Sequence, residues 1–515
     1  MNTPPIYGVR ERDELELQIQ SLLASLGDGR VDGVAYDTAW AARLALPYPG
    51  DGFETSMEWL RRHQYTDGTW GAPLVHYHDR YISTLAAIVA LQETLKEGSG
   101  HPRDARRVNR GEDALWRLVG KLGRDDSDTV GFPILSAMLA EEATELGLEV
   151  PRAPIRYADG FQKKIEVLLN QTDRNWRTST LIVSLEALRS NLLPDDDVLS
   201  PNGTVAASPS ATAGYLLQHD NETSLNCLTQ AEKKPGSTGM PSFETIDLFE
   251  IIWSLHRLRI NGAIDLKDPV VHAKLAYLWE NWSPEHGISH STSFPISDID
   301  DTALGFALLQ WAGFPVTESV FSHYERAEHF CCFPHETNPS PSVHLNLLAA
   351  LRLSGVDKDR PDWISKIIAT LRRFDENGSY WWDKWHTSPY YVTNIAMYSL
   401  PGYADDLVYS RIRWIIRTQN DDGGWGYLDS STAEETAYCL DSLLVWEELG
   451  GTVDNSRLDR AARLLLDNLN SDQYDSLWIH KGLYLPRTIV RAMILGTFYK
   501  YMRRNKWKTT ISSLG

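Results

Sequence analysis

The sequence predicts an all-α protein, on the evidence of helical periodicity, turn signals and a scarcity of strand-like runs. Apolar residues recur every three or four positions in most segments, as where Leu304, Leu308 and Trp311 fall at i, i+4 and i+7. Glycine or Asn-Gly punctuates the ends of such segments, as helix C-termini favour. Runs that alternate apolar and polar residues are few. We therefore expect many helices of about 10–15 residues.

The individual helices can be followed in chain order. The clearest are residues 82–96 (ISTLAAIVALQETLK), 302–313 (TALGFALLQWAG), 342–355 (SVHLNLLAALRLSG) and 436–450 (TAYCLDSLLVWEELG). The smooth apolar stretch Ile82–Leu91 is far too short to cross a bilayer. We therefore expect these segments to be helices in the hydrophobic core of a water-soluble protein.

The length and net charge of the chain limit the classes of function that it can have. The chain has 515 residues, room for two to four domains, and 50 basic against 69 acidic residues give a net charge of −19. This balance argues against a nucleic-acid partner and against docking on an anionic membrane. The four cysteines fit neither a zinc site nor a disulfide framework, and the N-terminus lacks the apolar core of a secretory signal. We expect a cytoplasmic protein with no integral membrane association.

A short motif occurs twice. Gln64–Gly71 and Gln419–Gly426 share the pattern Q-x3-G-x-W-G, and Asp375–Trp381 is a degenerate relative. The alternative is three unrelated Asp-Gly turns, but two full matches favour a repeat. Repeated helical hairpins laid side by side can close into a ring of inner and outer helices.

Three carboxylates crowd together just before an apolar segment. Asp298, Asp300 and Asp301 precede the run FALLQWAG. Taken alone, the cluster is typical of a capped helix N-terminus. A second interpretation is a Mg²⁺ site, because aspartate clusters hold Mg²⁺ through diphosphates.

Other motifs, spread along nearly the whole chain, help to interpret this acidic cluster. In order and rough spacing they resemble those of class II terpene cyclases, and specifically of bacterial class II diterpene cyclases. The matching segments are Tyr36–Trp40 (YDTAW), Ser208–Ala213 (SPSATA), Asp247–Trp253 (DLFEIIW), Asp298–Ala303 (DIDDTA), Asp383–Trp385 (DKW) and Trp478–Tyr484 (WIHKGLY).

This resemblance implies two α/α-barrel domains, called β and γ, with γ inserted into β. From the motif positions we place β at residues 1–45 and 263–515, and γ at residues 46–262. The resemblance further implies that geranylgeranyl diphosphate is cyclised to a bicyclic diphosphate of labdane, halimadane or clerodane type. No DDxxD ionisation motif of the class I kind is seen, so the diphosphate is expected to survive. A class I diterpene synthase or a phosphatase would then act on the product.

The resemblance makes Asp300 the proton donor, with Asp298 and Asp301 in support. An alkene is a poor base, so the donor must be a strong acid that still holds its proton at neutral pH. An ordinary aspartate has a pKa of about 3.9, and burial beside other carboxylates raises that value. A helix N-terminus favours the ionised form instead, so burial must outweigh it.

The carbocations that follow need an apolar cavity with aromatic faces. The aromatic-rich segment 381–391 and the predicted helix 302–313 offer candidates, although core packing is the usual role of such side chains. The candidates are Trp311, Trp382, Trp385, Tyr390 and Tyr391.

The diphosphate needs positive charge, for which Mg²⁺ with acidic ligands and a few basic side chains is the usual solution. The family carries an acidic Mg²⁺ motif in γ, and the loosely matching segment here offers Asp126 and Asp128. A solvated acidic loop is the alternative. Lys384 and Lys481 lie inside family motifs and are candidate diphosphate partners. The HxH of His76 and His78 is interpreted as structural.

The end of the reaction is less clearly encoded. Related plant enzymes that make ent-copalyl diphosphate use a His–Asn pair to activate water, and Val183 and Ser242 occupy those positions here. Relatives that rearrange the bicycle use a late His and Tyr. Tyr484 matches that tyrosine, and His344 or Asn346 is the candidate for the histidine position, although a core histidine is the commoner role.

Three alternatives remain open. The first is a drimane-type cyclase acting on farnesyl diphosphate, and the second is a squalene-hopene type cyclase. The third is a non-catalytic α/α-barrel binding protein that keeps the acidic cluster as a helix cap.

Overall fold

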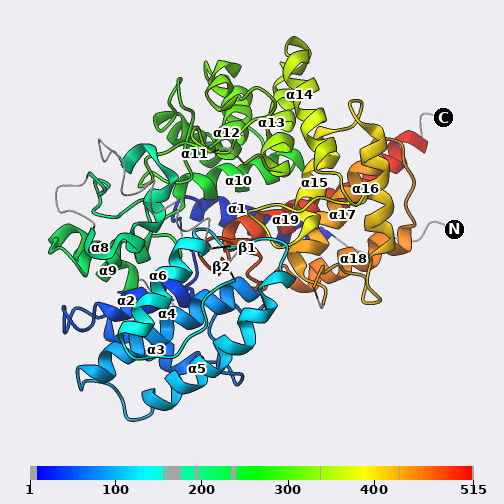
Figure 1. Cartoon of the computed structure of the whole chain (residues 1–515). Coiled ribbons are helices and arrows are strands. Elements are labelled where there is room, and N and C mark those ends of the chain that lie inside the picture. The colour runs from blue at the N-terminus through cyan, green and yellow to red at the C-terminus, as the bar shows by residue number, and fades with distance from the viewer. Residues whose placement is uncertain are drawn as a thin grey trace.

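Two rings of helices make up the molecule, one above the other in Figure 1. The structure is a computed structural model that describes residues 9–29, 31–154, 157, 176–191, 197–233, 239–336, 338–428 and 430–512. Nearly all of its regular structure is helical, so the predicted all-α class is confirmed.

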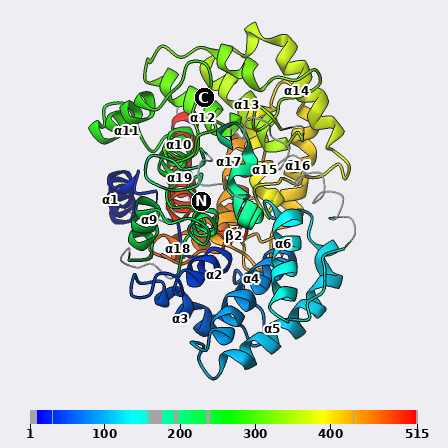
Figure 2. The same cartoon turned by 60° about the vertical axis from the view of Figure 1, so that its left-hand side comes forward.

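The larger ring is a double layer of helices. Each inner helix packs on the next, and the last closes on the first, in the order α10 (Asp247–Ile260), α12 (Ile299–Trp311), α13 (Pro341–Ser354), α15 (Pro389–Ser399), α17 (Ala433–Glu448) and α19 (Arg487–Ser512). Outer helices cover them, as Figure 2 shows: α1 (Val9–Ser25), α11 (Pro269–Glu280), α14 (Pro361–Arg373), α16 (Asp405–Arg417), α18 (Asn455–Asn468) and two 3₁₀ turns, Glu318–Tyr324 and Asp357–Asp359. This is an α/α barrel.

The smaller ring repeats the plan. Its inner layer runs through α2 (Ala35–Arg43), α4 (Tyr77–Lys96), α6 (Phe132–Glu145), a 3₁₀ segment (Thr180–Asn191) and α8 (Pro209–Leu216), which closes on α2. Outside it lie α3 (Glu54–Arg62), α5 (Asp104–Leu118), α9 (Glu222–Lys233) and two 3₁₀ turns, Val119–Arg124 and Trp176–Thr178.

A short antiparallel hairpin lies between the two rings (Figure 1). Its strands are β1 (Trp478–Ile479) and β2 (Leu483–Tyr484), and Trp478 pairs with Tyr484.

Burial separates inner from outer helices as their sequences predict. Residues 299–309 of α12 are buried on every side, as expected of a helix enclosed by others. In α14 the buried residues form one stripe at Trp363, Ile364, Ile367, Thr370 and Leu371, which is the pattern of a surface helix. Among the described residues, no helix has the length and apolar character of a membrane span.

The two hydrophobic cores divide the chain earlier than we predicted. One core takes residues from Ala35 to Met240, and the other takes residues up to Val34 and from Phe243 onward, except that Phe294 and Ile296 join the first core and that Ala72, Ile479 and Leu483 form a small third cluster. The two crossings, where the chain passes from one core to the other, lie side by side, because the Val34 N–H donates to the Met240 carbonyl at 2.9 Å. We therefore propose domain boundaries near these crossings in place of 45/46 and 262/263.

The repeated motif has the same structure at each occurrence. The indole N–H of Trp70 donates to Leu60 O, and that of Trp425 to Ile415 O, both at 2.8 Å and both ten residues back. Trp381 of the degenerate copy makes the same bond to Leu371 O at 3.1 Å. The tryptophan thus pins each connecting loop to the end of the preceding outer helix, which explains the repeat.

Candidate active site

A cavity of about 560 Å³ lies between the two rings, at the N-terminal ends of the inner helices of the larger ring. Residues of both rings line it. Nine of the thirty residues that line it are aromatic, namely Phe243, Phe249, Trp253, Phe294, Phe333, Trp385, Tyr391, Trp478 and Tyr484. A cation held here would face ring surfaces instead of water.

The three predicted acids meet in this cavity because α12 begins there. Asp298 is the N-cap, and its Oδ1 accepts the Asp301 N–H at 2.8 Å. Asp300 and Asp301 occupy the first turn, and all three side chains line the cavity. The three acids therefore form the capped N-terminus of α12 and also lie together in the cavity wall.

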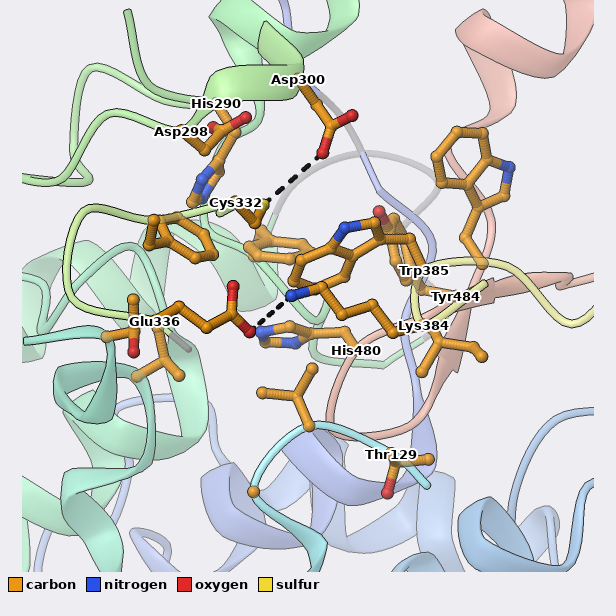
Figure 3. A pocket seen from close by; sticks show the side chains of 18 of the residues that line it. Thr129, His290, Asp298, Asp300, Cys332, Glu336, Lys384, Trp385, His480 and Tyr484 are labelled. Atoms are coloured by element: carbon orange, nitrogen blue, oxygen red, sulfur yellow. Dashed lines mark hydrogen bonds and ion pairs between the residues drawn. The ribbon is translucent and has the colours of Figure 1, made fainter. Parts of the chain in front are cut away.

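Asp300 is only 7% exposed and makes two side-chain contacts. Asn346 Nδ2 donates to its Oδ1 at 2.8 Å, and Cys332 Sγ lies 3.5 Å from its Oδ2 (Figure 3). Burial, followed by the nearby charge of Asp298, raises the pKa of Asp300 to about 7, and the Asn346 hydrogen bond acts in the opposite direction. A neutral acid at ordinary pH is the form that protonation of an alkene needs.

The two flanking acids are shifted in the same direction. Burial raises the pKa of Asp301 to about 7, although Trp253 Nε1 donates to its Oδ1 at 2.7 Å. Burial and the proximity of Asp301 raise the pKa of Asp298 well above its ordinary value. Burial thus outweighs the helix N-terminus at all three positions.

Two of the five predicted aromatic candidates reach the cavity, namely Trp385 and Tyr391. The structure places the other three elsewhere. Trp382 packs edge-on against Tyr427, Tyr390 stacks on Trp414, and Trp311 lies under the Arg259 guanidinium. Trp253 and Trp478 line the cavity instead, and their places inside the DLFEIIW and WIHKGLY motifs were the signal that would have found them.

The two candidate lysines have different surroundings. Lys384 lines the cavity, where it pairs with Glu336 and lies 4.8 Å from the Trp385 ring centroid (Figure 3). Lys481 is fully buried between the rings and is not brought to the cavity. Its Nζ donates to Glu186 Oε1 at 2.7 Å and to the Ser208 and Ser210 hydroxyls at 2.8 Å each. Lys481 therefore ties the two rings together.

The acidic loop of the smaller ring reaches the cavity through Asp128, which is 48% exposed. Asp126 lines an adjoining hollow of about 290 Å³ that shares Ser127 and Lys384 with the cavity. Asp125 holds the loop in place, because its Oδ2 accepts the backbone N–H of His78 at 2.9 Å and lies 2.7 Å from His78 Nδ1.

The residues that we examined for a role in ending the reaction do not all reach the cavity. Tyr484 and Val183 line the cavity. Asn346 reaches it only through Asp300. His344 is not brought to the cavity, and both of its ring nitrogens are engaged, with Ser340 O at 2.7 Å and with the Phe330 N–H at 3.1 Å. Sequence reasoning missed His290 and His480, which do line the cavity.

Comparisons with known proteins agree with this geometry. Residues 334–480 match the squalene-hopene cyclase C-terminal domain. The chain is 33% identical over 491 residues to a type B diterpene cyclase of Mycobacterium tuberculosis, covering 92% of this chain and 96% of that protein. It is 30% identical over 380 residues to a (−)-kolavenyl diphosphate synthase of Tripterygium wilfordii, covering 71% of this chain and 45% of the plant protein. The solved structure of ent-copalyl diphosphate synthase from Streptomyces platensis superposes with a TM-score of 0.78 at 26% identity, covering 96% of this chain and 99% of that one.

Proposed function

The chain belongs to the class II diterpene cyclases, and we propose that it starts the cyclisation of geranylgeranyl diphosphate by protonating the terminal alkene from Asp300. The observation that carries this proposal is a buried carboxyl group, with a pKa of about 7, facing an aromatic cavity. The product is a bicyclic diphosphate in which the diphosphate is retained.

The contacts of Asp300 suggest which oxygen gives up the proton. Oδ1 accepts a hydrogen bond from Asn346 at 2.8 Å, whereas Oδ2 has only the weaker contact with Cys332 Sγ at 3.5 Å, so the proton of the neutral carboxyl belongs on Oδ2. Transfer to the alkene carbon leaves a tertiary cation, which the next double bonds of the chain attack in turn. Trp253, Tyr391 and Trp478 present their rings along this path, and the buried walls exclude the water that would quench the cation.

For the diphosphate we infer a Mg²⁺ ion held by Asp128 and Asp126, with Lys384 beside it. Mg²⁺ favours one or two carboxylates together with substrate phosphate oxygens, and a half-exposed Asp128 at the cavity fits that preference. The ion would neutralise the diphosphate in a chain with a net charge of −19.

Replacing Asp126 or Asp128 by alanine should raise the Mg²⁺ concentration needed for half-maximal activity. Asp113→Ala, an exposed acid on α5, is the matched control and should leave that concentration unchanged. An unchanged requirement in both loop variants would remove them from the metal site.

The substrate is tested by incubation with geranylgeranyl diphosphate and Mg²⁺, followed by dephosphorylation and mass spectrometry. A bicyclic C20 alcohol is the expected product. Turnover of farnesyl diphosphate or squalene alone would replace the substrate assignment. Turnover of none of the three would favour a binding protein.

The retained diphosphate implies a further enzyme. A class I diterpene synthase that ionises the diphosphate, or a phosphatase that removes it, would consume the product. The buried thiols Cys331, Cys332 and Cys439 suit a reducing compartment, which favours a cytoplasmic location.

A further inference from the structure

Two histidines of the cavity wall each have a buried ring nitrogen that no described residue hydrogen bonds. These atoms are Nδ1 of His480 and Nε2 of His290. The buried histidines behind the cavity differ, since both ring nitrogens of His344 and of His386 are engaged. A buried polar atom without a partner costs free energy. His256 also has such a nitrogen but lies away from the cavity, so it is the position in the cavity wall that singles out His290 and His480.

The structure holds the His480 ring firmly in place. His480 lies in the turn of the β1–β2 hairpin, where its N–H donates to Gly482 O at 2.9 Å and its carbonyl accepts the Val130 N–H at 2.8 Å. Its ring centroid is 4.1 Å from that of Phe243, and Tyr484 approaches edge-on at 6.5 Å. The imidazole is therefore fixed within the aromatic wall that would hold a cation.

The Asp300 carboxyl and the His480 imidazole line different parts of the cavity. Figure 3 shows Asp300 at one end of the cavity and His480 well away from it, on the side of the hairpin. When the bicycle is of labdane type, cyclisation leaves the final cation several carbons from the carbon that was first protonated. A base at a distance from Asp300 is placed for that later cation.

We propose that His480 is the proton acceptor that ends the cyclisation, an inference that rests on the function proposed above. A ring nitrogen takes a proton from a carbon adjacent to the cation. The C–H electron pair becomes the new double bond, and the positive charge moves to the imidazolium. Asp300 has lost one proton and His480 has gained one, so the reaction is an isomerisation, and proton exchange with water returns both groups to their starting states.

The protonation states of the two groups are compatible before substrate binds. Burial, and then the adjacent Lys481 charge, lowers the pKa of His480 well below its ordinary value, whereas the pKa of Asp300 is raised to about 7. The proton therefore stays on the acid, and His480 stays neutral. A carbocation is a far stronger acid than an imidazolium, so its proton still moves to His480.

The neighbouring groups are less suited to this step. His290 lies on the segment that leads into α12, the helix that carries the acid, and it packs on Phe294 at 4.3 Å. Burial raises the pKa of Tyr484, so its hydroxyl stays neutral, and a neutral phenol is a weaker base than an imidazole.

The test compares wild type with His480→Phe, His480→Gln and His290→Phe, measuring both consumption of geranylgeranyl diphosphate and the dephosphorylated products. Both His480 variants should still consume substrate, because Asp300 is intact. The parent product should fall at least about tenfold as a share of the total. Alkene isomers or a hydroxylated bicycle, formed by other proton acceptors or by water, should replace it.

His256→Gln is the matched control, because this buried histidine on α10 also has an unpartnered ring nitrogen but does not line the cavity. It should keep the parent product. An unchanged product share in both His480 variants would overturn the assignment, as would a product change confined to His290→Phe. If His480→Phe fails to fold, His480→Gln decides. Failure of the wild type to convert the substrate would instead overturn the proposed function.

Discussion

At Asp300 two opposing influences set the strength of the acid. Burial and the Asp298 charge keep the proton on, whereas the hydrogen bond from Asn346 favours the ionised form. The result is a pKa of about 7, which is high enough for the carboxyl to hold a proton near neutral pH but low enough for it to donate that proton. The resemblance to the family had suggested a different role for Asn346, at the end of the reaction.

Activity should depend on pH with the sign that this pKa requires. Only neutral Asp300 can donate, so kcat/KM should be level below about pH 6 and should fall about tenfold per pH unit above 7. A pH profile of the wild type checks this. If this descending limb of the kcat/KM profile began near pH 4, the range of an ordinary aspartate, the expectation would be contradicted.

Asn346→Ala should move that limb. Loss of a hydrogen bond to a charged group, worth about 1.5–3 kcal/mol, should raise the pKa of Asp300 by about one unit or more. The limb then shifts to higher pH, and the weaker acid lowers the plateau. Cys332→Ala, which removes only a 3.5 Å sulfur contact, is the control and should shift the limb less. Equal profiles for the two variants would count against this role of Asn346.

Among the elements, the repeated motif gives the clearest link between sequence and structure. Gln64 Nε2 donates to Gly68 O and Arg107 O, and Gln419 Nε2 donates to Gly423 O and Arg457 O, all between 2.7 and 3.0 Å. Each glutamine thus joins its own loop to the next outer helix. The sequence revealed the repeat, but not that its glutamine crosses to another helix.

Gln64→Ala and Gln419→Ala should therefore destabilise the protein without changing the product. Each variant removes two half-buried hydrogen bonds, so we expect a loss of about 2 kcal/mol. Calorimetric Tm values, read beside product analysis, test this. Gln473→Ala, an exposed position, should leave Tm unchanged. A new product from either motif variant would show that the repeat acts on the cavity.

The hairpin between the rings shows why some site residues escaped prediction. His480 and Lys481 are adjacent in the turn of the hairpin but have different surroundings. His480 lines the cavity, whereas Lys481, predicted from its place in a family motif, lies in the interface with Glu186. Asp300 and Trp385 could be found within motifs and Tyr391 within an aromatic-rich segment, whereas Phe243, Phe294 and Phe333 meet only after the chain has folded.

At the scale of the whole molecule, the two rings are joined by a buried ion pair. Lys481 and Glu186 both have side chains that are 0% exposed, and Tyr36 OH donates to the same Glu186 oxygen at 3.1 Å. The YDTAW, SPSATA and WIHKGLY motifs thus converge on the interface that closes the cavity. Their shared role explains why they occur together.

Lys481→Met should destabilise the protein by about 3–5 kcal/mol, because it leaves the Glu186 carboxylate buried without a counter-charge. Adding Glu186→Gln should recover most of that loss, as measured by thermal unfolding. If Lys481 instead binds the diphosphate, the single variant would raise KM while leaving stability unchanged, and the second substitution would rescue nothing.

The central claim is that the proton which starts the reaction comes from Asp300. The most direct test is to run wild type and Asp300→Asn with geranylgeranyl diphosphate in D₂O and to count deuterium in the product. We expect one deuterium per molecule from the wild type, at the carbon that receives the proton, and no bicyclic product from Asp300→Asn. A wild-type product without deuterium, or a bicyclic product that persists in Asp300→Asn, would contradict the claim.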